Sequence, residues 1–114
     1  MEVFKKSHHL VLDVYKVTTK FPPGEKFGLV PQMRRAVVSI PANLIEGSER
    51  VGRLEYCRFV SIAKGSAGEL RYYFLRAKDL GYISPEEYSR FRREIEEIGK
   101  MLSGLVKALS TPKA

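Results

Sequence analysis

The chain has 114 residues, a length typical of one domain, and a hydrophobic content of 44% that is ordinary for a globular protein. Its single cysteine, Cys57, excludes an intrachain disulfide and a multi-cysteine zinc site. The 20 Lys and Arg residues outnumber the 13 Asp and Glu residues, and the net charge of +7 favours an anionic partner. We expect a single domain over residues 1–114.

Apolar residues recur at the spacing of an amphipathic helix in four successive segments, and no segment alternates as a strand does. Clusters of Gly and Pro separate these segments and predict turns. We therefore expect helices over residues 5–20, 28–48, 53–80 and 85–110. Short connections make neighbouring helices antiparallel, so the sequence predicts an all-α fold, an antiparallel up-down-up-down four-helix bundle.

The second segment carries a polar stripe beside its apolar seam. The stripe residues follow one another in steps of four, four and three: Arg35, Ser39, Asn43 and Glu46. Because buried polar groups need partners, we expect a cross-helix network with Ser66 and Glu69, in which Arg35 pairs with Glu69. A network that fixes helix register is the favoured interpretation, and an internal polar pocket is the alternative.

The third segment combines small residues with a row of basic ones. Gly65 and Gly68 weaken a helix, so we expect them to allow close packing against the second helix near Pro41, with a notch for a ligand as the alternative. The basic residues Lys64, Arg71 and Lys78 are seven apart and therefore share one helix face, with Arg53 close to the same line and Tyr72 beside it. This face is our candidate nucleic-acid site. The alternative is a solvated face that only keeps the protein soluble.

The fourth segment gives the clearest helix signal. Ser84, Pro85 and Glu87 fit an N-cap, a first helical residue and a capping box. Apolar residues then follow in alternating steps of three and four, and we expect Gly99 and Gly104 beside this seam to permit close packing. The predicted core includes Ile40, Leu44, Leu70, Ile95, Ile98 and Leu102.

The sequence offers no convincing catalytic or metal-binding constellation. Neither His8 nor His9 follows a Glu at the spacing of a di-iron site. Ser61 and Lys64 match a short Ser-x-x-Lys pattern, but the partner motifs of those acyl-enzymes are absent. We therefore expect no enzyme, no cofactor and no metal. No run approaches the roughly 18 apolar residues that a membrane span needs, so we expect a cytoplasmic protein without a membrane partner.

Five apolar residues lie beside the seams rather than on them: Val11, Val38, Ile45, Val60 and Ile62. A lone bundle needs about three apolar positions per heptad, so some of these are surplus and exposed. Exposed apolar patches usually mark interfaces, and the sequence therefore predicts a homo-oligomer.

Longer stretches carry a family resemblance. Residues 25–29 (Glu-Lys-Phe-Gly-Leu), 32–43 (Gln-Met-Arg-Arg-Ala-Val-Val-Ser-Ile-Pro-Ala-Asn), 56–59 (Tyr-Cys-Arg-Phe) and 80–82 (Leu-Gly-Tyr) resemble the four-helix bundle proteins encoded in bacterial 23S ribosomal RNA intervening sequences. The resemblance implies a ring-like homopentamer with no known enzymatic activity. A distant relative is the accessory protein of diversity-generating retroelements, a basic pentamer that binds a reverse transcriptase and nucleic acid.

Together these observations favour a non-catalytic oligomeric binding protein that acts on structured RNA or a nucleoprotein. An assembly module that binds only another protein is the first alternative. An enzyme that uses the polar stripe of the second and third helices is a distant third.

Overall fold

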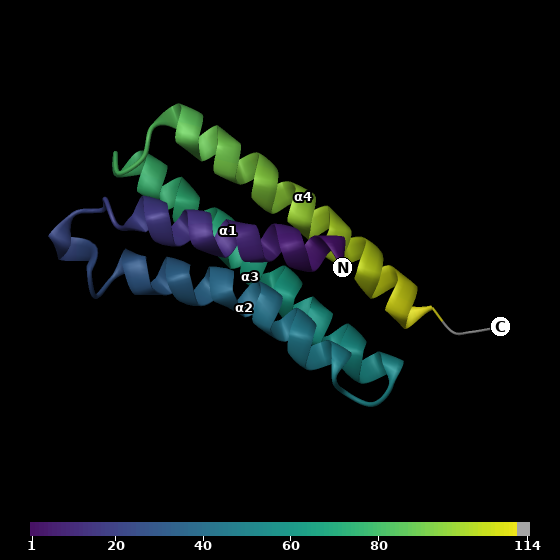
Figure 1. Ribbon diagram of the computed structural model, residues 1–114. Coiled ribbons are helices and arrows are strands. Elements are labelled where there is room, and N and C mark those ends of the chain that lie inside the picture. Colours follow the sequence, from purple (N-terminus) through teal and green to yellow (C-terminus); the bar gives the residue numbers. More distant parts are fainter. Residues whose placement is uncertain (112–114) are drawn as a thin grey trace.

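A computed structural model describes residues 1–111 and shows four α-helices with one short 3₁₀ helix (Figure 1). The helices are α1 (Glu2–Thr18), η1 (Pro23–Glu25), α2 (Leu29–Ser48), α3 (Arg53–Asp79) and α4 (Pro85–Ser110). The described residues contain no strand, so the all-α prediction is confirmed. The largest boundary error is in α1, which begins at Glu2 instead of residue 5 and ends at Thr18 instead of residue 20.

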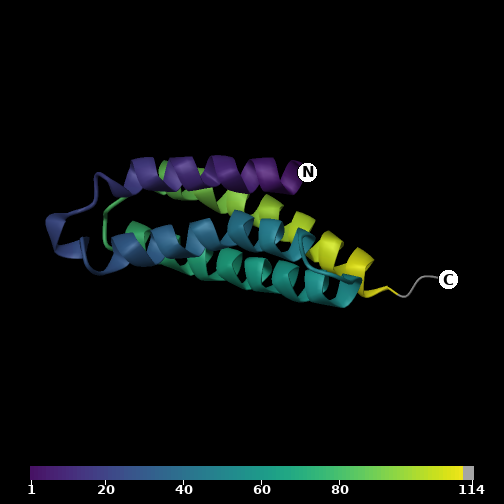
Figure 2. The ribbon, with the colours of Figure 1, turned by 60° about the horizontal axis from the view of Figure 1, so that its bottom comes forward.

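Successive helices run antiparallel, and contacts close the ring in the order α1, α2, α3, α4 and back to α1 (Figures 1 and 2). α1 is therefore diagonal to α3, and α2 is diagonal to α4. α1 has 17 residues against 27 in α3, or about 25 Å against about 40 Å at 1.5 Å per residue. Both views show the N-terminal end of α1 stopping short of the ends of α3 and α4.

α4 begins with the predicted capping box. The Glu87 amide donates to Ser84 Oγ at 3.0 Å, and the Ser84 amide donates to Glu87 Oε1 at 3.0 Å. Pro85 at the first helical position loses no hydrogen bond, because an amide there has no intrahelical partner. These residues fix where α4 starts and how it is placed beside α3.

The turn between α3 and α4 depends on Gly81. Its φ of 79° lies in the left-handed region, which a residue with a side chain adopts only at a cost. The Tyr82 amide donates to the carbonyl of Ala77 at 2.8 Å, and the Gly81 amide donates to that of Lys78 at 2.9 Å. This pair of bonds is the Schellman motif, which ends α3 and turns the chain back toward α4.

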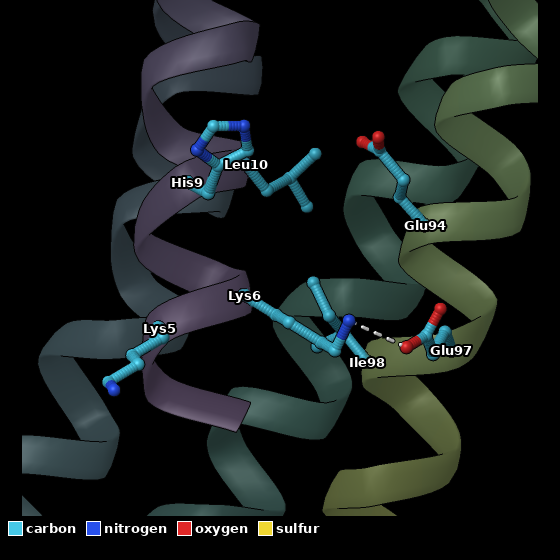
Figure 3. Close-up of a pocket in the computed structure, with 7 residues that line it drawn as sticks. All are labelled: Lys5, Lys6, His9, Leu10, Glu94, Glu97 and Ile98. Atoms are coloured by element: carbon cyan, nitrogen blue, oxygen red, sulfur yellow. Dashed lines mark ion pairs between the residues drawn. The ribbon is translucent and has the colours of Figure 1, made fainter. Parts of the chain in front are cut away.

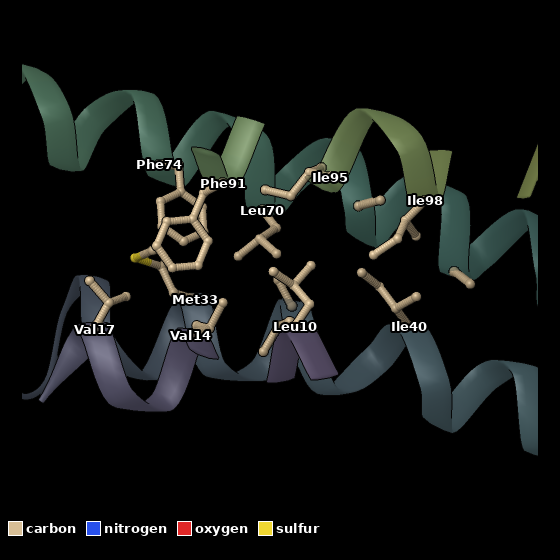
Figure 4. Packing of buried hydrophobic residues seen from close by; sticks show 14 of the residues in the cluster. Leu10, Val14, Val17, Met33, Ile40, Leu70, Phe74, Phe91, Ile95 and Ile98 are labelled. Atoms are coloured by element: carbon tan, nitrogen blue, oxygen red, sulfur yellow. The ribbon is translucent and has the colours of Figure 1, made fainter. Parts of the chain in front are cut away.

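One hydrophobic cluster takes residues from all four helices (Figure 4). The six residues predicted for the core are at most 3% exposed, which confirms their placement. The rings of Phe74 and Phe91 stack with their centroids 4.3 Å apart and join α3 to α4. Such burial removes apolar surface from water and supplies most of the bundle's stability.

The expected close packing at the glycines of α3 and α4 is wrong. A Cβ added at Gly65, Gly68, Gly99 or Gly104 would meet no heavy atom within 4 Å, so these positions are open. The neighbours Ala63, Ser66 and Ala67 point inward instead and are buried. Among the glycines within the α-helices, the one in close contact is Gly47 of α2, where a Cβ would lie 2.8 Å from Phe59 Cβ.

Candidate nucleic-acid interface

A groove runs between α3 and α4 on the outer surface of the bundle. It consists of two adjoining hollows of about 430 and 310 Å³, which share Gly68, Arg71 and Glu96. Lys64 and Lys100 line the first hollow, from α3 and α4 respectively. We call this feature the α3/α4 groove; its remaining lining residues are Ala67, Tyr72, Leu75, Tyr88, Arg92, Ile95, Gly99 and Ser103.

Positive charge predominates along the α3/α4 groove. Lys64 and Arg71 are exposed, and no ion pair engages either of them within residues 1–111. Across the groove, the exposed Arg92 places its Nε 3.1 Å from Oε1 of Glu96, which is the acidic residue among the lining side chains. Lys100 is also exposed. Cations on both sides of one groove favour an anionic strand between them.

The third basic residue of the predicted row lies at the end of this groove. Lys78 is half-buried, with its Nζ 4.7 Å from the ring centroid of Tyr88 and 3.7 Å from Oδ1 of Asp79. The structure thus places Lys64, Arg71 and Lys78 along one side of α3, next to α4. Part of the Lys78 charge is already engaged by the aromatic ring and the carboxylate.

Two basic residues of the groove were missed from the sequence, namely Arg92 and Lys100. They lie eight residues apart on α4, so they share a face. The spacing therefore shows in the sequence that Arg92 and Lys100 share one face of α4. The apolar seam of α4 does not show, however, whether that face lies beside α3 or beside α1.

Arg53 lies apart from the α3/α4 groove. Its Nη2 donates to the carbonyl of Ala108 at 3.0 Å and to that of Thr111. Ala108 lies in the last turn of α4, where carbonyls lack partners within the helix, and Thr111 follows the helix as its C-cap residue, so the guanidinium caps that end. The prediction that grouped Arg53 with Lys64 missed this, because the first residue of α3 lies beside the end of α4.

The polar stripe of α2 meets α3 where the helices are in contact. Ser39 Oγ and Ser66 Oγ lie 2.8 Å apart. Nδ2 of the Asn43 side chain donates to the backbone carbonyl of Ser39 at 2.8 Å and to the Oγ of Ser39 at 2.9 Å. Ser66 also donates to the carbonyl of Ile62 at 3.1 Å. Ser39 and Ser66 thus join the two helices, while Asn43 bonds within its own helix.

Arg35 and Glu69 form the cross-helix pair that the sequence predicts. The Tyr73 hydroxyl donates to Glu69 Oε2 at 2.5 Å. This hydroxyl and, next, the Arg35 guanidinium hold the pKa of Glu69 below its usual value. The Arg35 side chain is 55% exposed, so solvent screens the pair and its contribution to stability is small.

Glu46 does not belong to this network, which corrects the prediction. Its Oε1 lies 3.0 Å from Nη2 of Arg50, one turn further along the same helix. At this end of α2 the α3 residues Tyr56 and Phe59 pack against Gly47, and within residues 1–111 no α3 side chain forms a hydrogen bond or ion pair with Glu46. The stripe residues line none of the five best-formed pockets of residues 1–111, so these pockets do not favour an internal polar pocket at the stripe.

A third hollow, of about 320 Å³, lies between α1 and α4 (Figure 3). Lys6 reaches across it and places its Nζ 2.9 Å from Oε1 of Glu97, while Lys5 points away. Burial raises the pKa of Glu94, whose Oε1 lies 3.7 Å from Nη1 of Arg90. Because the positive and negative side chains here pair with each other, this hollow has no preference for a ligand of one sign.

The apolar residues beside the seams divide into exposed and buried ones. Val38, Ile45 and Ile62 are 38%, 51% and 42% exposed, as the surplus argument predicts. Val60 is fully buried and Val11 is half-buried against the core, so these two are not among the surplus residues. Val60 lies directly after Phe59 in α3, and both side chains point into the bundle.

Of the three exposed residues, Val38 and Ile45 lie on α2 and Ile62 lies on the neighbouring helix α3. Val38, Ala42 and Ile45 follow one another at helical spacing on the outer side of α2. Tyr15 of α1, on one neighbouring helix, is 41% exposed, and Ile62 belongs to α3, the other neighbour. We call these five residues the α2 face.

No group of His, Cys, Asp and Glu within residues 1–111 has the geometry of a metal site. Over the same residues, no helix combines the length and apolar character needed to cross a bilayer.

The fold and surface define a basic four-helix bundle with a cationic groove between its last two helices. The chain belongs to the 23S rRNA-intervening sequence protein family, whose model matches residues 1–104. It is similar to the crystal structure of a protein of unknown function from the S23 ribosomal protein family of Bacteroides thetaiotaomicron. The TM-score is 0.83 and the identity 26%, over 92% of this chain and 98% of that one. No curated protein matches.

Proposed function

We propose that the protein is a non-catalytic homo-oligomer that binds structured RNA, free or within a nucleoprotein, through the α3/α4 groove. One observation carries this proposal: basic residues line both sides of the groove. Lys64 and Arg71 lie on the α3 side, and Arg92 and Lys100 lie on the α4 side. Phosphate contacts by Lys and Arg supply most of the affinity of nucleic-acid binding that is independent of sequence.

The comparisons support an RNA context without assigning a reaction. The family is described by the 23S rRNA intervening sequence, and the similar structure is assigned to a ribosomal protein family but has unknown function. Neither description names an enzymatic activity. A cytoplasmic location fits an RNA partner and the single unpaired Cys57.

A salt titration with a structured RNA tests the proposal. Each phosphate contact releases counterions, so the log–log slope of affinity against salt is expected to be about −0.7 to −0.9 per contact. Arg71→Ala should reduce the slope by about one unit and weaken binding to all sequences alike. The matched control is Lys16→Ala, which also removes one positive charge. Lys16 lies on α1, the helix diagonal to α3. Equal effects of both variants would exclude the groove as the site.

Assembly is the second part of the proposal and rests on the α2 face. Its apolar side chains are exposed in the single chain, and a second copy of the chain would remove them from water. Because α2 is diagonal to α4, assembly through α2 leaves α4 accessible to RNA. The resemblance supports a pentamer as the form of this oligomer. In a ring, each subunit repeats the groove, so avidity strengthens RNA binding.

The alternative function is an assembly module that engages another protein and binds no nucleic acid. The exposed α2 face favours it as much as it favours self-assembly. The same titration separates the two functions, since the module predicts no salt-dependent binding of RNA.

A further inference from the structure

We infer that the α3/α4 groove accommodates an unpaired, single-stranded segment of a structured RNA rather than its duplex stems, and that Tyr72 stacks on one of the bases. This inference rests on the proposed function, because it names the form of nucleic acid that the same groove would take. It depends on the width of the groove, the two glycines that line it and the exposed aromatic ring at its edge.

The width of the groove favours one strand. Packed helices lie about 8–10 Å apart, and the groove is the space between two neighbouring ridges of side chains. An RNA duplex holds two backbones with the base pairs between them, so it is broader than this spacing and presents only its outer backbone and grooves to the protein. A duplex would therefore touch only the tips of the basic residues. A single strand can lie between the rows of α3 and α4 and contact cations on both sides.

Gly68 and Gly99 bring the helix backbone to the surface of the groove. Both line the first hollow, from α3 and α4, and a Cβ added at either position would have no heavy atom of the chain within 4 Å. Glycine in a helix interior reduces stability, and here no neighbouring residue of the bundle requires it. Lys64 and Lys100 line the same hollow, so a sugar-phosphate chain lying over the two glycines would be within reach of both ammonium groups.

Tyr72 supplies a stacking surface at the second hollow. Its side chain is 56% exposed, and it lines the hollow together with Arg71 and Arg92. A cationic groove with an exposed aromatic ring is the common arrangement of single-strand binding sites, where bases stack on rings and phosphates meet basic residues. A duplex keeps its bases stacked inside, so it cannot use this ring.

The basic row also sets a length. From Lys64 to Lys78 the helix advances about 21 Å at 1.5 Å per residue. A stacked strand advances about 3.4 Å per nucleotide, so the groove spans about six nucleotides. Glu96 lies within this path and pairs with Arg92, and an incoming phosphate would compete with it for that guanidinium.

The experiment compares three fluorescent probes on the full chain at several salt concentrations: an unpaired oligouridine, the matching unpaired DNA strand and an RNA duplex of equal length. We expect either unpaired strand to bind at least about tenfold more tightly than the duplex. Tighter binding of the RNA strand than of the DNA strand would show that the groove also senses the 2′-hydroxyl. Tyr72→Ala should weaken binding of the unpaired strands by about 5- to 150-fold, whereas Tyr72→Phe, which keeps the ring, should not.

Gly68→Ala provides a second measurement. The added methyl group narrows the hollow and should weaken binding of unpaired strands, although alanine raises the melting temperature of the helix. Gly65→Ala is the matched control, because Gly65 is equally open but does not line the groove. A duplex that binds as tightly as the strands, or Gly68→Ala without effect, overturns the inference and leaves RNA binding standing. No salt-dependent binding of any probe overturns both. If Gly68→Ala dissociates the oligomer in sedimentation, the groove holds a second copy instead.

Discussion

Tyr82 donates a hydrogen bond of 2.8 Å from its hydroxyl to Oε2 of Glu25, and this bond joins the turn after α3 to the loop before α2. The other carboxylate oxygen, Oε1, accepts the amide of Leu29 at 2.9 Å and so caps the start of α2. The Tyr82 ring lies 5.3 Å from that of Phe21, centroid to centroid. One carboxylate therefore holds together three segments at the same end of the bundle.

The first prediction separates the two bonds of Glu25. Tyr82→Phe removes only the bond to the hydroxyl, whereas Glu25→Ala removes that bond and the cap of α2. We expect the melting temperature to fall in the order wild type, Tyr82→Phe, Glu25→Ala, because two lost bonds cost more than one. An Ala variant that melts with or above the Phe variant would show that the cap contributes nothing.

The same site sets a pH dependence. The Leu29 amide and then the Tyr82 hydroxyl hold the pKa of Glu25 below its usual value. A lowered folded-state pKa adds stability that is fully present above the unfolded value of 4.5 and is lost as the pH falls through the folded value. The gap in melting temperature between wild type and Glu25→Ala should therefore close in acid. Melts from about pH 3 to about pH 7 measure it.

The second prediction tests the core. Leu70 is fully buried, so Leu70→Ala should cost about 2–5 kcal/mol of unfolding free energy through lost transfer energy and a cavity. Leu80→Ala is the control, since Leu80 is 53% exposed and the change should stay within about 0.5 kcal/mol. Denaturant unfolding of both variants decides the matter. A loss below about 0.5 kcal/mol at Leu70 would contradict its place in the core.

The sequence predicted the helices and the core well because both follow from local rules. The spacing of Phe91, Ile95 and Ile98 identifies one helix face, and Ser84 with Glu87 marks a helix start, without any knowledge of neighbours. The start of α1 was placed three residues late, since Met1 provides no side-chain cap. Arg35 and Glu69 were paired correctly because both lie at the contact of adjacent antiparallel helices.

The predictions that were wrong concerned contacts between segments that are distant in the sequence. Arg53 bonds to carbonyls at the end of α4, 55 residues away, and no local pattern indicates this. Gly65 and Gly68 were expected to face α2, but helix phase turns them outward while Ala63 and Ser66 turn inward. Glycine has no side chain, so it is neither apolar nor polar in the helical pattern. The presence of Gly65 and Gly68 in the sequence therefore did not show which surface of α3 they line.

The third prediction uses this contrast between glycines. Gly47→Ala places a Cβ 2.8 Å from Phe59 Cβ and 3.0 Å from Tyr56 Cδ1, so overpacking should cost about 1–3 kcal/mol. In Gly65→Ala the added Cβ has no heavy atom within 4 Å, so the higher helix propensity of alanine should increase the unfolding free energy by about 1 kcal/mol. Unfolding by denaturant measures both. Effects of the same sign would contradict the assigned packing.

The fourth prediction concerns Glu94 in the hollow between α1 and α4. Burial, with a smaller contribution from Asp13, raises its pKa above the usual value, although Arg90 opposes the shift. The folded state thus binds the proton more tightly, so stability declines as the pH rises from 4.5 through the raised folded value. Glu94→Gln removes the charge and should raise the melting temperature at neutral pH but not in acid. A variant less stable at neutral pH would mean that the attraction to Arg90 outweighs burial.

The last prediction tests assembly through the α2 face. Ile45 is 51% exposed on α2, and Ile45→Arg would place a charge where a second copy is proposed to pack. An unpaired charge in an interface is costly, so the dissociation constant of the oligomer should rise at least about 30-fold. Leu80→Arg is the control, because Leu80 is 53% exposed at the turn after α3 and lies outside the α2 face.

Sedimentation over a range of micromolar concentrations measures both variants, and circular dichroism verifies that each remains helical. We expect wild type and Leu80→Arg to share one assembly state while Ile45→Arg shifts toward the monomer. The dissociated variant should still bind RNA with the salt slope of one groove, but more weakly, since the avidity of repeated grooves is lost. A wild-type protein that remains monomeric at all concentrations would contradict the homo-oligomer and leave the α2 face for a different protein partner.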